Sequence, residues 1–339
     1  MSASRPSSAL PAEIRSRARA LSRRDNWQNF LYLGADWAVV VAVVLAAERA
    51  DWPMVTAAGL VVIGSRQRAL ANMLHEASHR KLFRTRWLND YVGELLCADP
   101  LFAGLSSYRA DHVRHHRELW TQRDPDAVRY RRLGLAVLDY GQRTWRFGVR
   151  HILFPFTPAQ VPRDIAIGVL NGTRLRRETL RLAAFWFVAG GVVALTGTWK
   201  LVVLYWIAPF LSTYQVIRYW AEMAEHAGLS LDNRWLSTRS WTAGWITRSL
   251  LAPHADDLYH LAHHLYPSVP HYRLRALHEQ LLAVPQYAAG HHCDGFFRAR
   301  SPDRPSVVED IRSGGFARGR RLLAADFVIQ SLTLKGATT

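Results

Sequence analysis

The sequence predicts an all-α integral membrane protein, with about four transmembrane helices in two hairpins and a helical cap in the cytosol. Three observations favour this fold class. Apolar runs occur in two pairs, and only a short polar turn separates the members of each pair. Arginine is frequent beside the pairs but nearly absent from the two turns. The mean hydropathy is close to neutral, so a large polar part must accompany the spans.

The first pair of apolar runs follows a basic arm. Residues 1–28 are polar and rich in arginine, with a short helix expected over 12–24, and they do not resemble a cleavable secretory signal. An apolar run then covers residues 30–47, and a second begins at Trp52 and continues as helix through Leu74. Each run is near the ~20 residues that a helix needs to cross a bilayer, so the two should form a hairpin.

The second pair covers residues 182–195 and 201–219, around a turn at 197–200. Because each hairpin turn carries a single basic residue, the positive-inside rule predicts that both termini and all polar segments lie in the cytosol. Between the hairpins, residues 91–105 are expected to be re-entrant or interfacial, and amphipathic surface helices are expected over 106–180. The aromatic residues that favour such helices are Trp145, Phe147, Phe154 and Phe156.

The chain therefore divides into a basic arm (1–28), a membrane domain (29–285) and a C-terminal cytosolic segment (286–339). Its formal net charge is +16, mostly from arginine. The basic residues are spread along the chain without a nucleic-acid-binding motif, so we expect contact with a lipid bilayer and an acidic protein rather than nucleic acid. The two cysteines support neither a disulfide framework nor a thiolate metal site.

Nine of the fifteen histidines have the spacing of metal ligands. The first box is His75-Glu76-Ala77-Ser78-His79, whose two imidazoles share one face of a helix. A second spacing occurs twice, as His112-Val113-Arg114-His115-His116 and His260-Leu261-Ala262-His263-His264. The middle histidine of each triplet is angularly offset from its neighbour, so it can serve a different metal. The ninth histidine is His226, just after the second hairpin.

Other interpretations compete with a two-metal centre. The first box alone is also the signature of a zinc metalloprotease, with Glu76 as general base. A non-catalytic metal-binding or lipid-binding membrane protein is a further alternative. Eight or nine imidazoles exceed the four ligands of one tetrahedral zinc, so two metals are implied. Imidazole suits iron, zinc or copper, and the ligand type does not choose between them.

The combined motifs resemble those of the membrane-bound fatty acid desaturase and hydroxylase superfamily over roughly residues 30–280. The first box is followed by Phe83, Asn89 and Gly93, and the second by Asp124-Pro125-Asp126, as in that superfamily. The third box continues as Leu265-Tyr266-Pro267-Ser268-Val269-Pro270 and is preceded by Glu225-His226. One departure is that His254, Asp256 and Asp257 stand where the superfamily often has asparagine.

The resemblance implies two iron ions held by the nine histidines, with O2 as co-substrate. It also implies that carboxylates orient neutral imidazoles, although each of them can equally be a simple surface charge. The candidates are Glu76, Asp111, Glu222, Glu225, Asp256 and Asp257. The terminal segments are too short for a fused haem carrier, so electrons should come from a ferredoxin-like donor and its reductase, docking on the basic cap.

Arg66 and Arg68 bear on the substrate. They precede His75 on one helix and lie near or within the membrane, where a charge is costly. They either reach the headgroups or pair with Glu94 or Asp99, or they bind an anionic group of the substrate. The resemblance extends to a rhizobitoxine-type subgroup that acts on small amino-acid-derived compounds, and the Arg66-Gln67-Arg68 run is consistent with that subgroup.

The expected activity is desaturation of an unactivated C–C bond of a fatty acyl or related lipid, with O2 and two electrons. The alternatives are a hydroxylase or desaturase of a small amino-acid-derived or specialised metabolite and an intramembrane zinc metalloprotease. We expect the protein in the bacterial cytoplasmic membrane, with the metal site on its cytosolic side.

Overall fold

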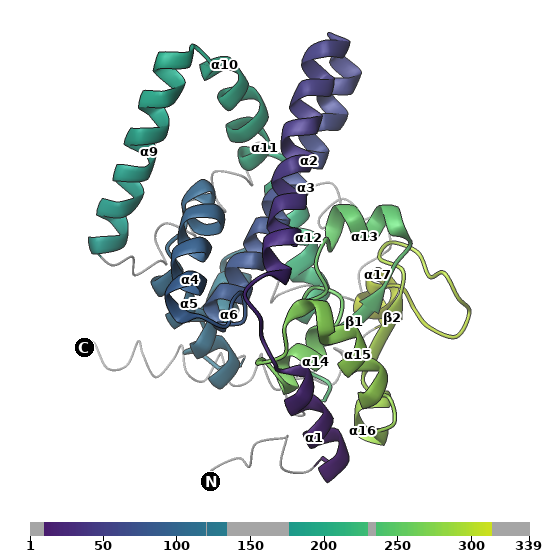
Figure 1. The fold of residues 1–339 in the computed structure, drawn as a ribbon. Helices are drawn as coiled ribbons and strands as arrows, with labels where there is room; N and C mark the ends of the chain where they lie inside the picture. The colour runs from purple at the N-terminus through teal and green to yellow at the C-terminus, as the bar shows by residue number, and fades with distance from the viewer. Residues whose placement is uncertain (1–9, 120, 134–175, 230–234, 314–339) are drawn as a thin grey trace, which may run out of the picture.

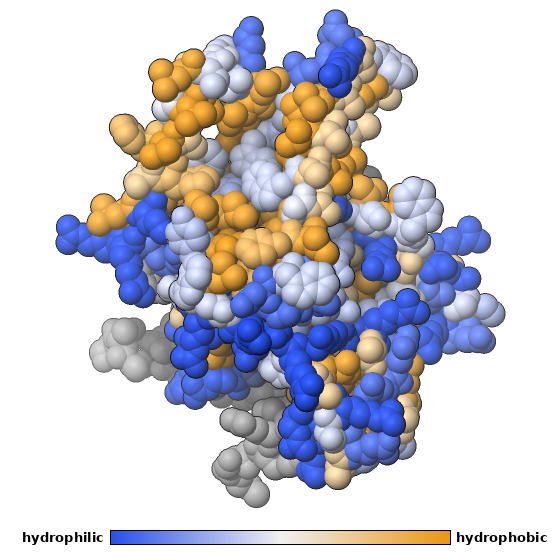
Figure 2. Space-filling model, viewed as in Figure 1, coloured by the Kyte–Doolittle hydropathy of each residue, from blue (hydrophilic) through white to orange (hydrophobic). Residues whose placement is uncertain are grey.

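The computed structural model describes residues 10–119, 121–133, 176–229 and 235–313. It is mostly helical and divides into two halves (Figure 1). Apolar side chains gather over the upper half, which contains α2, α9 and α10, and hydrophilic ones cover most of the lower half (Figure 2). A protein that lies half in lipid and half in water needs such a division of its surface. The surface helices expected between 134 and 175, with Trp145, Phe147, Phe154 and Phe156, lie outside the described residues.

The first predicted hairpin is formed by α2 (Gln28–Ala50) and α3 (Pro53–Ser78). Asp51 adopts a left-handed conformation that ends α2, and Pro53 occupies the first position of α3, where its missing N–H is not needed. α3 is one continuous helix of 26 residues that includes the apolar run and the first box up to Ser78, and His79 is its C-cap. The prediction that the second run continues as helix is therefore confirmed.

The second hairpin begins with α9 (Arg176–Thr196), turns at Gly197 with φ of 66°, and returns along a broken helix. That return consists of α10 (Trp199–Val202), a π-helical turn (Val203–Ile207), α11 (Ala208–Leu211) and α12 (Thr213–His226). Three segments are long and apolar enough to cross a membrane, namely 28–50, 176–196 and 199–226. Helix α3 is not among them, because the charged residues in its second half lower its mean hydropathy.

The two hairpins meet where α3 crosses the start of α12. Thr213 donates a hydrogen bond to the Leu60 carbonyl at 2.8 Å, and Gln67 donates one to the Trp206 carbonyl at 2.9 Å. A Cβ on Gly64 would lie 2.3 Å from Thr213 Oγ1 and 2.8 Å from the Tyr214 backbone nitrogen. The absence of a side chain at Gly64 thus lets the backbones approach closely.

The cap consists of short helices packed below the hairpins. In chain order they begin with α1 (Ala12–Leu21), α4 (Arg86–Val92), α5 (Leu105–Arg117) and α6 (Pro125–Leu133). The later ones are α13 (Trp245–Leu251), α14 (His260–Leu265), α15 (His271–Leu281), α16 (Pro285–Ala288) and α17 (Val307–Ser313). Residues 91–105, expected to be re-entrant or interfacial, contribute a π-helical turn (Gly93–Ala98) and a 3-10 turn (Asp99–Leu101), and Cys97 and Ala98 in them are fully buried.

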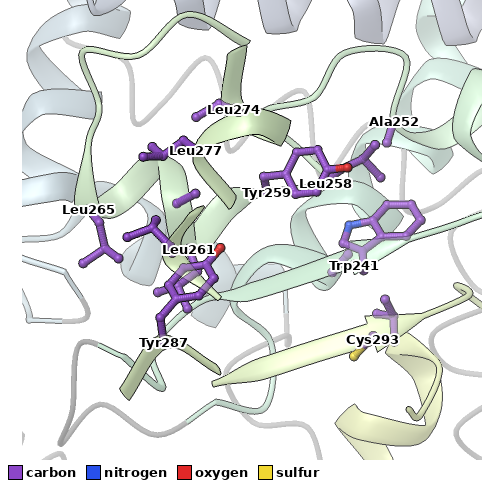
Figure 3. Close-up of a cluster of buried hydrophobic side chains, with 14 of the residues drawn as sticks. Trp241, Ala252, Leu258, Tyr259, Leu261, Leu265, Leu274, Leu277, Tyr287 and Cys293 are labelled. Carbon is purple, nitrogen blue, oxygen red and sulfur yellow. The ribbon is translucent and has the colours of Figure 1, made fainter. Parts of the chain in front are cut away.

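The all-α prediction misses a small sheet. Strands β1 (Arg239–Thr242) and β2 (His291–Asp294) pair in parallel, with Trp241 opposite Cys293. Trp241, Tyr287 and leucines of α14 and α15 form an apolar core beside this sheet (Figure 3). The two strands are far apart in the sequence, and neither four-residue strand has a periodicity that reveals its partner. The sheet could therefore not be predicted from the sequence. Residues 286–313 therefore pack against the same core as α14.

Replacing Gly64 by alanine should destabilise the protein, because the new methyl group would collide with Thr213 and the Tyr214 backbone. We expect a thermal unfolding temperature several degrees lower in detergent. Gly34→Ala is the matched control, since Gly34 lies within α2 and a Cβ there meets nothing within 4 Å. Equal unfolding temperatures for the two variants would show that the α3–α12 contact is not tight.

Candidate metal centre

Five histidines from the end of α3, from α5 and from α14 form a first cluster. They are His75, His79, His112, His116 and His263, and their ligand nitrogens all lie within 4.8 Å of one another. The Nε2 atom of His112 is 2.8 Å from those of His75 and His79, and 3.0 Å from that of His116. The Nε2 atom of His263 is 3.1 Å from that of His75.

The other four predicted histidines form a second cluster: His115, His226, His260 and His264. His260 Nε2 lies 3.0 Å from His226 Nε2 and 3.1 Å from His264 Nε2. The middle histidine of each triplet lies in the opposite cluster from its neighbours, as the helical offset predicts. The second and third boxes each contribute to both clusters, so the two clusters are adjacent.

The clusters fit a pair of cations. Two neutral imidazoles can share one hydrogen, but five ring nitrogens about 3 Å apart cannot all be satisfied by one another. Ligand nitrogens at ~2.1 Å from one metal ion would lie about 3 Å from their neighbours, as they do here. Burial, followed by the neighbouring imidazoles, holds the pKa of His112 and His264 well below its usual range. These two rings are therefore neutral at pH 7, which is the form that binds metal.

Several of these imidazoles are anchored through the ring nitrogen that faces away from the cluster. His75 Nδ1 lies 3.2 Å from Asp256, and His226 Nδ1 lies 3.1 Å from the Ser237 carbonyl. His115 Nδ1 lies 3.0 Å from Asp124, which is only 1% exposed. Burial lowers the pKa of His115, but Asp126 and Asp124 more than offset this and raise it. An acceptor at Nδ1 fixes the tautomer whose Nε2 lone pair faces the cluster.

Among the six carboxylates considered from the sequence, Asp256 contacts the Nδ1 atom of a clustered histidine. Glu222 pairs with Arg129 and Arg218, while Asp257 pairs with Arg68 and Asn72. Glu225 pairs with Arg68, and its Oε2 lies 3.8 Å from His260 Nε2, on the side that faces the cluster. Asp111 has no hydrogen bond or ion pair among the described residues. Asp124 is not among the carboxylates that the sequence suggests as partners of the histidines, although it begins the Asp-Pro-Asp motif after the second box.

Glu76 lies in a buried ion pair instead of facing the cluster. Its Oε1 is 2.5 Å from Lys81 Nζ, and its Oε2 accepts a hydrogen bond from the His271 backbone. Lys81 is itself 3.4 Å from His263 Nδ1 and 3.5 Å from Asp256. Both members of the pair are fully buried, so Glu76 is not positioned as the general base of a metalloprotease. No periodicity or motif indicated the role of Lys81.

The expected partners of Arg66 and Arg68 are wrong. Arg181 of α9 pairs with Glu94 and Asp99, because the second hairpin lies over that segment. Arg66 is 2.8 Å from Asp36, which also lies 2.9 Å from His254. Arg68 binds Asp257 through Nε and Nη2, and Glu225 through Nη2 at 3.1 Å. The two arginines thus join α3 to α2, to α12 and to the loop before the third box.

A cavity of about 270 Å³ borders both clusters. His75 and His112 of the first cluster and His115 and His260 of the second are among its lining residues. Arg68 lines it, whereas Arg66 does not. Much of the remaining wall is ionisable. It includes Asp111 on α5, Asp126 on α6 and Glu222 on α12. The apolar part includes Leu74, Leu101 and Phe210. Such a mixed wall suits a small polar molecule.

These features define the class of the protein: a membrane oxidoreductase of the desaturase type, with histidine clusters suited to metal. The chain belongs to the fatty acid desaturase family, whose pattern matches residues 50–295. It is 28% identical over 321 residues to a dihydrorhizobitoxine desaturase of Bradyrhizobium elkanii, with 88% of this chain and 87% of that protein covered. It is 24% identical over 229 residues to an sn-1 acyl-lipid omega-3 desaturase (ferredoxin) of a Synechocystis strain, with 62% of each covered.

Replacing Asp124 by asparagine should weaken metal binding at the second cluster, because His115 loses the carboxylate that orients it. A loss of roughly 10- to 100-fold in metal affinity is typical of such a change. Metal content after dialysis against a graded chelator series measures it. Asp303→Asn, at an exposed position, is the control. Equal metal retention by the two variants would remove Asp124 from the site.

Replacing Lys81 by methionine should destabilise the protein by roughly 3–5 kcal/mol, because a buried charge loses its partner. Glu76 would be left unpaired, so the double variant Lys81→Met/Glu76→Gln should recover part of the loss. Chemical unfolding in mild detergent measures both. Lys200→Met is the control, since Lys200 is exposed in the first turn of α10. Similar stability of Lys81→Met and the control would contradict the buried pair.

Proposed function

We propose that this chain is a di-iron desaturase that uses O2 and two electrons from an external donor. The observation that carries the proposal is the pair of histidine clusters beside one cavity. Removal of two hydrogens from –CH2–CH2– supplies two electrons, and the donor supplies two more with two protons. Together these reduce O2 to two molecules of water and leave –CH=CH–. Bound iron would supply the redox chemistry that activates O2, which zinc cannot.

In this proposal each histidine cluster has a defined task. The first cluster holds one iron and the second cluster the other. Asp256 and Asp124 accept hydrogen bonds from Nδ1 of His75 and His115, so Nε2 of each ring carries the lone pair. Lys81 and Glu76 hold the backbone near His271 and thereby support the third box. Glu225 Oε2 lies 3.8 Å from His260 Nε2 and would be a nearby oxygen donor if a metal ion were bound at the second cluster.

The substrate that the cavity suits best is a small polar molecule rather than a long acyl chain. A volume of 270 Å³ is at the low end of ligand sites. Six carboxylates and three guanidinium groups line it, and their desolvation by an alkyl tail would be costly. The similarity to a dihydrorhizobitoxine desaturase across most of both chains supports a small amino-acid-derived substrate. The fatty acyl alternative is supported by the more distant omega-3 relative and by the apolar wall at Leu74, Leu101 and Phe210.

For the membrane we propose four spans, with α3 as the fourth. The charges in α3 that lower its hydropathy are paired, Arg66 with Asp36 and Arg68 with Asp257, which reduces their cost in a membrane. The positive-inside rule then supports a cytosolic cap in a bacterial cytoplasmic membrane. His79, His116 and His264 are partly exposed, and Arg80, Arg114 and Arg117 stand near them in the chain. An acidic ferredoxin-like donor would be attracted to that face.

The test is iron content and turnover of purified protein. Wild type should hold about two irons per chain and form a carbon–carbon double bond only with both O2 and a reductant. His263→Ala should lose iron and all turnover, because His263 lies in the first cluster and is fully buried. His291→Ala, outside both clusters, should keep both. Zinc in place of iron, or full activity of His263→Ala, would contradict the proposal.

A further inference from the structure

His226 is the clustered histidine that belongs to none of the three boxes, and its orientation depends on two pieces of backbone. It is the last residue of α12, and its Nδ1 atom lies 3.1 Å from the Ser237 carbonyl. Its Nε2 atom lies 3.0 Å from His260 Nε2, inside the second cluster. The direction of this ring is therefore determined by where α12 ends and by where the backbone at Ser237 lies.

One guanidinium group connects these two pieces of backbone. Arg239 is fully buried at the start of β1, two residues after Ser237. Its Nη1 atom donates to the Ala224 carbonyl at 2.8 Å, and its Nη2 atom donates to the Ala227 carbonyl at 3.0 Å. These carbonyls stand on either side of His226 in the chain, where the end of a helix lacks backbone donors and favours a cation. Arg239 thus links the end of α12 to the strand that follows Ser237.

The third donor of the Arg239 guanidinium binds α17. Its Nε atom donates to Asp310 Oδ2 at 2.8 Å, in an ion pair between a fully buried cation and a carboxylate whose side chain is 13% exposed. Helix α17 is itself fixed, because Val307 and Ile311 are fully buried in the core beside the small sheet. Loss of the Asp310 charge would leave Arg239 buried without its counter-ion, which would weaken its hold on the backbone.

We propose that Asp310 is a positioning residue for the metal ion of the second cluster. Asp310 holds Arg239, Arg239 holds the end of α12 and the start of β1, and these two elements hold the ring of His226. The proposal rests on the proposed function in one respect, namely that the second cluster binds a metal ion. It gives a role in the metal centre to α17, which lies beyond the residues that match the family pattern.

The expected effect is confined to one of the two clusters. The first cluster is built on the end of α3, on α5 and on α14, and His75 in it has its own support from Asp256. Within the described part of the chain, none of its five histidines is bonded to Ser237, Arg239 or Asp310. The second cluster has four imidazoles, so a displaced His226 would leave its metal ion with three.

The test is a titration of metal-free, full-length protein in nanodiscs with Co²⁺, an ion that imidazole binds and whose visible spectrum reports its ligand geometry. Wild type should bind two cobalt ions per chain. Asp310→Asn keeps the shape of the side chain and removes its charge. It should weaken the binding of one ion at least about tenfold and alter the spectrum of that ion, while the other ion binds as in wild type. Wild-type affinity for both ions would overturn the proposal.

A second titration separates positioning from a general loss of stability. His264→Ala disables the second cluster, so the first metal site remains to be titrated. In this background Asp310→Asn should leave the remaining cobalt affinity unchanged. If it weakens or abolishes that affinity, the ion pair supports the cap as a whole, and the specific role of Asp310 is refuted.

Asp303→Asn is the matched control, because Asp303 is exposed and precedes α17. His291 Nδ1 also lies 3.1 Å from Asp310, but His291→Ala leaves the bond to Arg239 in place and should keep both ions. A wild type that binds two ions, as does Asp310→Asn with equal affinity, refutes the positioning role alone. A wild type that binds fewer than two ions refutes the two-metal centre of the proposed function as well.

Discussion

Nine imidazoles facing one another constrain the whole cap. Like groups with inward lone pairs gain nothing from mutual contact, so each ring must be held from behind by the element that carries it, and several of the rings also have a partner at Nδ1. Asp256 and Asp124 provide such partners for His75 and His115. The clusters draw on the end of α3, on α5, on α12 and on α14, so these elements must meet at one point. Most of the remaining residues of the cap pack around these four elements and keep them in place.

The sequence predicts a good part of this arrangement because the spacing of the boxes acts through the geometry of single helices. The offsets i, i+3 and i+4 determine that His115 and His263 lie apart from their neighbours, and no tertiary information is needed for that. The hairpins are predictable for a similar reason, since length and hydropathy are local properties. The continuation of α3 through its arginines also follows from local pattern.

What the sequence does not predict depends on distant partners. Arg66 and Arg68 could pair with several nearby acids in the sequence, and the choice of Asp36 and Asp257 depends on how α2 and the third-box loop pack against α3. In the sequence Lys81 is one of many basic residues, and only the structure shows that Glu76 and Asp256 lie beside it. The pairing of β1 with β2 is likewise a product of packing. Burial decides which charges have a role, and burial is not a local property.

Helix α9, the first helix of the second hairpin, stands apart from the body of the protein (Figure 1). Only 6% of the apolar window of α9 is buried, and the helix is tied to the cap near its base by Arg181 and by Trp186, whose ring stacks on Phe102 at 4.4 Å. Little of the described part of the chain packs against α9, which leaves its apolar side chains available to lipid. The surrounding bilayer acts as a structural component of this enzyme, and a solvent that replaces it will disturb the outer hairpin well before it reaches the histidines.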